Sequence, residues 1–420
     1  MSNLSDNAKV TILLCSSLAL KDDVKPFTAI QWYNLSVKIY KSELKEPAAL
    51  LGLSADELIA KLAISETDAS RITVLLSRSI NVAFELQKLE SKGINVITKS
   101  DDDYPKRLIK VLGGRYAPPM LYYSGNLELA KNDCIGIVGS RNIDANGNAM
   151  CAEIAQKAAL ANITVVSGGA RGVDSTSRTV ALKNGGACIE FLADSMAKKI
   201  VQGEYIKPIL QNRLLVFSVV SPNQGFLVYS AMDRNKYIYA MAKKTFAIAA
   251  DLKRGGTWTG VMEALKRKWG YPYVWNTDIY RGNAELIKAG ASPFSNVDEL
   301  NFSNLDKEEA VNKLTMGNLF TEPYDTETYL VSDNSSEYSQ KKVFASDAIY
   351  KVALPIIKDF LKNEHTSKEI IEALNIVPKQ AEEWLKKAVA EKQIIKLTRP
   401  VRYIATGDNQ EQQCNFADSN

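Results

Sequence analysis

Two short apolar runs, each ending in small residues and one arginine, constrain the fold of this 420-residue chain more than any other feature. The first reads Ile135-Gly-Ile-Val-Gly-Ser-Arg-Asn142, and the second reads Val165-Val-Ser-Gly-Gly-Ala-Arg-Gly-Val-Asp174. Runs rich in β-branched residues predict buried parallel strands, each of which opens at its carboxyl end into a tight loop.

The segments around these runs complete βαβ units. Residues 149–161 are alanine-rich and predict a helix, and residues 163–167 predict the next strand. A second helix and strand are expected at 175–184 and 186–192, and each crossover should be right-handed. Further elements follow in the same order: strands at 214–220, 245–250 and 271–275, and a short helix at 283–290. The expected class is α/β, with a Rossmann-like, doubly wound, mostly parallel sheet.

The two loops predict an anion site. Glycines let the backbone approach a ligand closely, and the helix after each loop should direct its N-terminal N–H groups at the same place. The arginines add full charges, so phosphates are the expected ligands. One phosphate should be held by Gly139, Ser140 and Arg141, and a neighbouring one by Ser167, Gly168, Gly169 and Arg171. Asp174 is expected to orient an arginine or a backbone N–H. The alternative, that the glycines only serve turns, does not explain an arginine in both loops.

A third glycine turn carries more positive charge. Gly255 and Gly256 form the turn, and Thr257 or Thr259 is expected to cap the following helix, leaving N–H donors for a phosphate. The basic cluster at 266–268 either binds a ligand or complements the helix dipole, and Trp258 either stacks on a base or belongs to the core. Asn235 is a candidate for bonding to a sugar or backbone group. The expected continuation of the track is Arg234, Lys243, Lys244 and Lys253.

Seven motifs occur in an order that resembles the DprA/Smf family of DNA-processing proteins. They are Tyr104-Pro-Lys-Arg-Leu108, Pro119-Met-Leu-Tyr-Tyr-Ser-Gly125, Ile137-Val-Gly-Ser-Arg141, Val166-Ser-Gly-Gly-Ala-Arg-Gly-Val-Asp174, Arg234-Asn235, Gly255-Gly-Thr-Trp-Thr259 and Asn283-Ala-Glu-Leu-Ile-Lys-Ala-Gly290. The resemblance covers roughly residues 93–300. It implies a homodimer that binds and protects incoming or processed single-stranded DNA and loads the RecA recombinase onto it.

The chain departs from the family pattern at three places. Ser175-Thr-Ser-Arg-Thr179 lacks the usual histidine, Ser218-Val-Val-Ser-Pro222 lacks the usual glutamate, and Ser230-Ala-Met-Asp-Arg-Asn-Lys236 replaces an aromatic-Pro-x-Arg-Asn-Arg segment. Phosphate contacts therefore carry over more safely than partner contacts.

Two other functions stay open. The turn before Glu263 resembles that of the lonely-guy family of nucleotide phosphoribohydrolases, in which an acid and an arginine act on a glycosidic bond. Glu263 and Arg171 would take those parts, although Arg254 stands where that family has proline. The third candidate is a sensor domain for a nucleotide signal.

Other catalytic classes find little support, and the expected protein is not an enzyme. A Walker A segment is absent, and the spacing in Gly136-Ile-Val-Gly139 does not fit the nicotinamide fingerprint, so no cofactor is expected. One histidine and scattered cysteines give no metal set.

Composition limits where the protein works and how it binds. A net charge of +4 means that any nucleic-acid site must be a local basic patch. Five cysteines, an odd number, fit a reducing cytosol. The apolar stretch at 10–20 is too short to span a bilayer, which takes about 20 residues. We therefore expect a cytoplasmic protein without membrane contact.

The chain divides into five predicted parts. Residues 1–92 read as a helical module resembling sterile-alpha-motif or helix-hairpin-helix folds, with Ser54 as an N-cap, and residues 93–300 read as the α/β domain. A linker is expected at 301–344 and a disordered tail at 406–420. Between them, helices at 345–362, 367–374 and 379–392 and a hairpin at 394–404 predict a winged-helix-like module. Its capping signature is Thr366-Ser-Lys-Glu369, and His365 lies at a predicted helix boundary.

Overall fold

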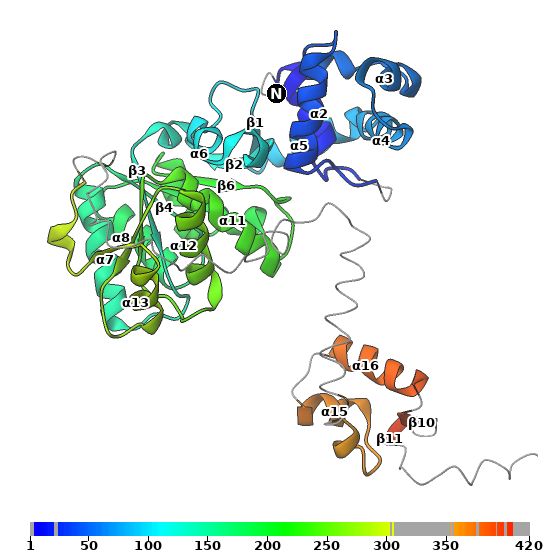
Figure 1. Ribbon diagram of the computed structural model, residues 1–420, viewed down its shortest axis with the longest axis vertical. Helices are drawn as coiled ribbons and strands as arrows, with labels where there is room; N and C mark the ends of the chain where they lie inside the picture. The colour runs from blue at the N-terminus through cyan, green and yellow to red at the C-terminus, as the bar shows by residue number, and fades with distance from the viewer. Residues whose placement is uncertain are drawn as a thin grey trace, which may run out of the picture. The chain divides into compact units, whose positions relative to one another are not determined.

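A computed structural model describes residues 4–20, 24–302, 305, 354, 357–374, 378–391, 393–398 and 401–405 of the chain. The chain separates into two compact units, Met1–Leu319 and Phe320–Asn420, which are described in turn (Figure 1). Among the described residues, no helix has the length and apolar character needed to cross a membrane.

The centre of the first unit is a nine-stranded sheet in the order β1-β2-β6-β5-β4-β3-β7-β8-β9. From β6 to β9 the strands are parallel, whereas β1 and β2 add an antiparallel edge. The strands are β1 (Asn95–Thr98), β2 (Met120–Gly125), β3 (Cys134–Val138), β4 (Thr164–Ser167), β5 (Cys188–Leu192), β6 (Leu214–Ser218), β7 (Lys244–Ala247), β8 (Tyr271–Trp275) and β9 (Ser292–Phe294). The predicted mostly parallel, doubly wound sheet is confirmed.

Chain order reverses between β3 and β7. From β3 the chain builds β4, β5 and β6 in one direction, and then returns to place β7 on the other side of β3. Ligands of open α/β sheets bind outside the carboxyl ends of the strands at such a switch point. The topology therefore makes the carboxyl ends of β3 and β7 the first place to look for a site.

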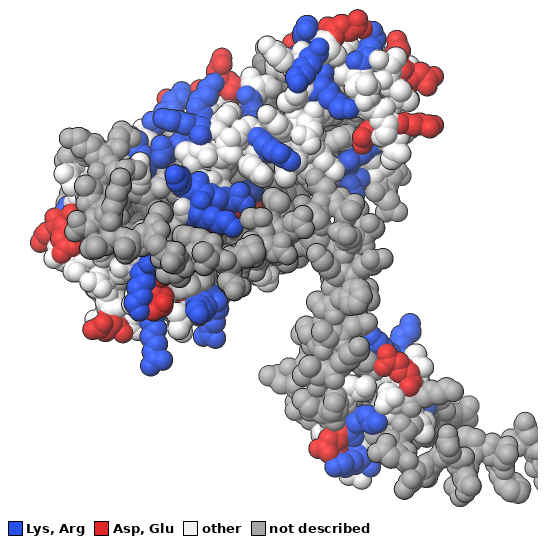
Figure 2. Space-filling model, viewed as in Figure 1, with Lys and Arg blue, Asp and Glu red and all other residues white. Residues whose placement is uncertain are grey.

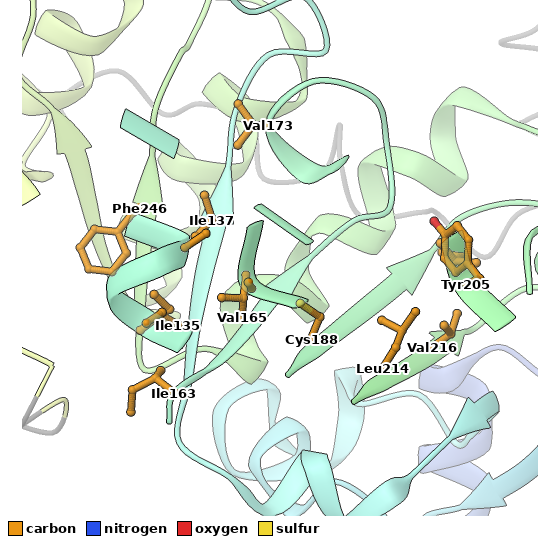
Figure 3. Close-up of a cluster of buried hydrophobic side chains, with 14 of the residues drawn as sticks. Ile135, Ile137, Ile163, Val165, Val173, Cys188, Tyr205, Leu214, Val216 and Phe246 are labelled. Carbon is orange, nitrogen blue, oxygen red and sulfur yellow. The ribbon is translucent and has the colours of Figure 1, made fainter. Parts of the chain in front are cut away.

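Helices cover both faces of the sheet. The first face packs against α7 (Ala145–Leu160), α8 (Val173–Lys183) and α10 (Gly203–Leu210), and the second against α6 (Lys106–Tyr116), α11 (Val228–Met241), α12 (Gly255–Arg267) and α13 (Arg281–Lys288). A short helix, α9 (Met196–Lys199), follows β5. Side chains of β3 alternate between the faces: Ile135 and Ile137 lie in the first core (Figure 3), and Cys134 and Val138 in the second.

The predicted elements of this domain match the observed ones closely. Residues 271–275 coincide with β8, and the other predicted strands differ at their ends by at most three residues. The helix predicted at 149–161 begins earlier, at Ala145, because the side chain of Asp144 caps it by accepting from Gly147 N at 2.8 Å.

Within residues 4–20 and 24–94, the structure describes five helices and a 3-10 turn before the sheet: α1 (Asp6–Cys15), α2 (Ala29–Lys41), η1 (Pro47–Leu50), α3 (Ala55–Leu62), α4 (Glu66–Leu76) and α5 (Ser79–Glu90). The predicted N-cap Ser54 is confirmed, and it forms a capping box with Glu57. Helix α1 belongs to two cores, because Ile12 and Leu13 pack in the first core of the sheet, and Val10 and Leu14 pack with the other N-terminal helices.

In the second unit the structure describes α15 (Ser367–Leu374), α16 (Pro378–Ala390) and a hairpin of β10 (Ile394–Thr398) and β11 (Val401–Ala405). The capping box of Thr366 and Glu369 is confirmed. His365 exchanges backbone hydrogen bonds with Tyr403 and stacks on Phe360. Most of the predicted linker, much of the helix at 345–362 and the tail at 406–420 lie outside the described residues.

Candidate functional site

Three loops meet at the switch point. Ser140 N donates to Ala249 O at 3.0 Å, which joins the loop after β3 to the loop after β7. Val173 N donates to Ser140 O at 3.4 Å, which joins the loop after β4 to the first loop. Residues 139–144, 168–172 and 248–254 therefore form one continuous surface, which we call the crevice loops.

Glycines are needed where these loops touch. A Cβ atom at position 139 would lie 2.4 Å from Val173 Cγ2, and one at position 172 would lie 2.5 Å from Ser140 O. Gly172 also has a φ of 73°, which side chains disfavour. Close packing of the loops is enough to explain these two glycines. This agrees in part with the alternative that the glycines serve the turns and not a ligand.

The predicted arginines lie on the outside of the crevice loops. Arg141 and Arg171 are exposed, as are Lys253 and Arg254 of the third loop. The guanidinium carbon of Arg141 lies 5.1 Å from the ring centroid of Phe226, and Arg254 lies 3.6 Å from Asp251. Planar guanidinium groups on a surface can bind phosphate oxygens in pairs.

The helices that begin at this surface differ in whether their N-terminal N–H groups are already bonded. Neither Gly172 at the start of α8 nor Arg254 at the start of α12 makes a side-chain cap. On α8 the first N–H, that of Val173, already donates to Ser140 O, whereas the first N–H groups of α12 make no hydrogen bond among the described residues and can bind an anion. The expected cap by Thr257 or Thr259 is wrong, because α12 already begins at Gly255.

The third N-terminus, that of α7, is already occupied. Asp144 caps it and also accepts from Tyr280 Oη at 2.6 Å. The N–H of Gly147 and the Tyr280 hydroxyl lower the pKa of Asp144. This helix therefore does not supply the anion contact that we expected after the first loop.

Asp174 fills the space inside the second loop. Its Oδ2 accepts hydrogen bonds from Gly168 N and Ala170 N, both at 3.2 Å, and lies 4.0 Å from Arg234 Nη1. This is the orienting contact expected of Asp174. Burial raises the pKa of its carboxyl, and Arg234 and the two N–H groups oppose that shift. A carboxylate thus holds the Gly168 amide, which was expected to bind a phosphate.

Apart from the exposed Arg171, the residues predicted in this loop are also internal. Ser167 is a buried residue of β4, and Gly168 covers Arg234 so closely that a Cβ there would lie 1.2 Å from Nη1. Ser140 of the first loop bonds through its hydroxyl to Asn142 of the same loop. Ser140, Ser167 and Gly168 therefore each have a structural role in these loops, and their contacts with phosphate stay a prediction.

Arg234 and Asn235 lie beneath the loops. Arg234 is buried, which lowers its pKa, and its Nε and Nη1 atoms make no hydrogen bond among the described residues. Asn235 Nδ2 donates to Gly256 O at 3.3 Å and so fixes the start of α12. We expected both residues to contact the nucleic acid directly, but neither lies on the surface. They support the crevice loops from below instead.

Lys243 and Lys244 stand at the opposite edge of the sheet. Lys244 pairs with Ile135 at the start of β3, and β3 and β7 are parallel, so both lysines are far from the carboxyl ends. Lys243 forms an ion pair with Asp133 at 2.6 Å, and Lys244 is buried, 5.1 Å from the ring centroid of Tyr273. The prediction that both lysines belong to the crevice site is wrong. They lie at the amino end of β7, whereas the site lies at the carboxyl ends of the strands.

Two residues at the crevice escaped the sequence analysis. Phe226, 47% exposed, contacts Arg141, and Lys199 Nζ donates to Gly169 O at 3.1 Å. Phe226 opens the apolar run Phe226-Leu-Val-Tyr229, whose exposure nothing in the sequence signals. Lys199 lies on α9, and only the neighbouring carboxyl end of β5 brings it to this loop.

The structure also shows where Trp258 and Glu263 of α12 lie. Trp258 packs against the second core. Glu263 pairs with Arg267 at 3.1 Å, in the half of the helix away from the crevice. At 1.5 Å per residue, Glu263 is about 12 Å along α12 from Gly255.

Comparison with known proteins identifies relatives of this domain. The family of DNA recombination-mediator protein A matches residues 95–303. The DNA processing protein DprA of Streptococcus pneumoniae is 31% identical over 216 residues, which cover 49% of this chain and 71% of that protein.

Two solved structures are similar to this chain. The X-ray structure of S. pneumoniae DprA covers 71% of this chain and 99% of that one, with a TM-score of 0.55 and 20% identity, and therefore shares the fold. The structure of Helicobacter pylori DprA, which describes a mode of single-stranded DNA binding, covers 49% of this chain and 92% of that one, with 23% identity and a TM-score of 0.40. The sequence match to the pneumococcal protein, the matching family and the order of the motifs agree: this chain is a member of the DprA/Smf family of DNA-processing proteins.

Proposed function

We propose that this protein binds single-stranded DNA at the crevice loops. The observation that carries the proposal is that the loops of the exposed Arg141 and Arg171 lie together with the uncapped N-terminus of α12 at the switch point of the sheet. Arginines and helix N-termini bind phosphate without reading base sequence. Phe226 beside Arg141 offers an exposed ring to an unpaired base, and such a ring favours single strands over a duplex.

Fluorescence anisotropy with labelled oligonucleotides tests this proposal. If about four phosphates are neutralised, log K against log salt should have a slope near −3 for single strands. A flat salt response or a strong preference for duplex DNA would contradict it.

Matched variants locate the contact. Arg141→Ala and Arg171→Ala should each weaken binding to all sequences alike, by about 1.5–3 kcal/mol. Lysine should restore only part of the loss, because it lacks the planar fork. Unchanged affinity in a folded Arg141→Ala protein would remove Arg141 from the site.

We also propose that the strand is bound without being cleaved, by a cytoplasmic homodimer that passes it to RecA. Support comes from membership of the DprA/Smf family and from the position of Glu263, which is paired with Arg267 and stands away from the crevice. Sedimentation would report the dimer, and the rate of RecA filament formation on single strands would report the transfer.

The two alternative functions have their own readout. Release of base from AMP or CMP that disappears in Glu263→Gln would favour the phosphoribohydrolase, because a general acid contributes roughly 10²–10⁴-fold in rate. A shift of the thermal midpoint by these nucleotides, without turnover, would favour the nucleotide sensor.

A further inference from the structure

The end of α12 away from the crevice carries a concentration of positive charge that the proposed site does not use. Lys266 and Arg267 occupy its last turn, and Lys268 follows as a left-handed C-cap with a φ of 58°. All three are exposed. The only acidic residue of the helix, Glu263, pairs with Arg267, so the cluster retains a net positive charge.

Two other helices add to this surface. On α6, the ring of Tyr116 lies near two guanidinium groups, with its centroid 5.9 Å from Arg115 Cζ and 5.7 Å from Arg267 Cζ. On α2, Tyr33 is 37% exposed, and its ring lies 3.3 Å from where a Cβ of Gly114 would be. We call Tyr33, Arg115, Tyr116, Lys266, Arg267 and Lys268 the amino-edge face. In Figure 2, blue side chains gather over the region where Figure 1 draws α6, α11 and α12.

Cations with aromatic rings between them are the pattern of a surface that binds single strands. The cations follow the phosphates, and the rings stack on bases that a duplex would hide. Helix-dipole compensation could account for Lys266 and Arg267 at the end of α12. It does not account for Arg115 or for the tyrosines, which come from α6 and α2.

Helix α12 links this surface to the crevice. It has 13 residues, and at 1.5 Å per residue it spans about 20 Å. Its N-terminus lies at the crevice loops and its C-terminus at the amino-edge face. We propose that the amino-edge face is a second contact for single-stranded nucleic acid, holding nucleotides of the same strand beyond those at the crevice. This inference rests on the proposed function.

Oligonucleotides of two lengths can test the two contacts separately. Oligothymidylates of about 6 and about 25 nucleotides bracket the usual site sizes of single-strand binders, about 4–16 nucleotides. Wild-type protein should bind the longer strand more tightly. The double variant Lys266→Glu, Lys268→Glu should weaken binding of the long strand at least tenfold, lower its salt slope by about 1.4, and change binding of the short strand less than twofold.

The control is Lys92→Glu with Lys183→Glu, which makes the same change of charge at exposed lysines outside both surfaces. It should leave both affinities nearly unchanged. Tyr33→Ala should weaken the long strand at least fivefold, and Tyr33→Phe should not, because stacking needs the ring and not the hydroxyl. Thermal melts monitored by circular dichroism confirm that each variant is folded.

The possible outcomes distinguish failure of this inference from failure of the proposed DNA binding at the crevice loops. If both strands bind and the double variant behaves like its control, the amino-edge face is not a contact, and the crevice proposal stands. Equal wild-type affinity for both lengths would overturn the inference in the same way. If wild-type protein binds neither strand, both proposals fail.

Discussion

Gly168 has no room for a side chain, because the Arg234 guanidinium occupies the space where a Cβ atom would lie, 1.2 Å from Nη1. Gly168→Ala must displace a buried cation, so we expect a loss of about 1–3 kcal/mol in the free energy of unfolding. Urea denaturation measures it. Gly203→Ala is the matched control, since a Cβ there meets nothing within 4 Å. If both substitutions cost the same, the packing of Arg234 against Gly168 is not tight.

Lys99 makes stability depend on pH. Burial lowers its pKa from 10.5 to about 8, although its Nζ donates to Gly114 O at 2.7 Å. With the folded pKa below the unfolded one, the contribution of Lys99 to stability is present above pH 10.5 and is lost as the pH falls through 8. Lys99→Met should therefore stabilise the protein by about 1–3 kcal/mol at pH 7.

The size of this gain should shrink as the pH rises from 8 to 10.5. Urea unfolding at pH 7 and pH 10 measures it, with the exposed Lys92→Met for comparison. A gain of the same size at both pH values would show that Lys99 does not carry the effect.

At the scale of elements, Arg78 ties the N-terminal helices together. It is 8% exposed and donates to backbone carbonyls at the end of α1 and after it, including Leu13 O and Leu18 O, and to Leu75 O of α4. Arg78→Met would leave these carbonyls without a charged donor, and we expect a loss of about 3 kcal/mol. Arg78→Lys should recover only part, because one ammonium cannot replace the fork. An unchanged melting temperature in Arg78→Met would refute this role.

Elements with local signals were predictable, and those that depend on distant partners were not. Strands β3 and β4 were predictable because each is an apolar run that ends in glycine. Strand β1 is only four residues long, half-buried at its start, and is defined by its pairing with β2. Its four residues have no periodicity strong enough to reveal that pairing.

The candidate site was predictable to the same extent. Sequence placed Arg141 and Arg171 at neighbouring strand ends because each follows its own strand. It could not show that Lys244 begins a strand and therefore lies far from the carboxyl ends, because that fact depends on how β7 pairs with the distant β3.

For the whole molecule, the crevice loops and the amino-edge face belong to the first compact unit. A fragment covering residues 1–319 should therefore bind single strands with the same affinity and the same salt slope as the full chain. Anisotropy titrations of both proteins over a range of salt concentrations measure this. A large loss of affinity in a folded fragment would assign part of the binding to residues 320–420.

Helix α1 turns one side to each of two cores, with Ile12 and Leu13 in one and Val10 and Leu14 in the other. The N-terminal helices cannot melt away while the sheet keeps its covering, because unwinding α1 opens both interiors together. Unfolding of this unit is therefore one cooperative event. Single-stranded DNA bound at the carboxyl edge of the sheet should therefore slow hydrogen exchange beside the DNA. It should also slow exchange of those amides in the N-terminal helices that exchange only when the whole unit unfolds.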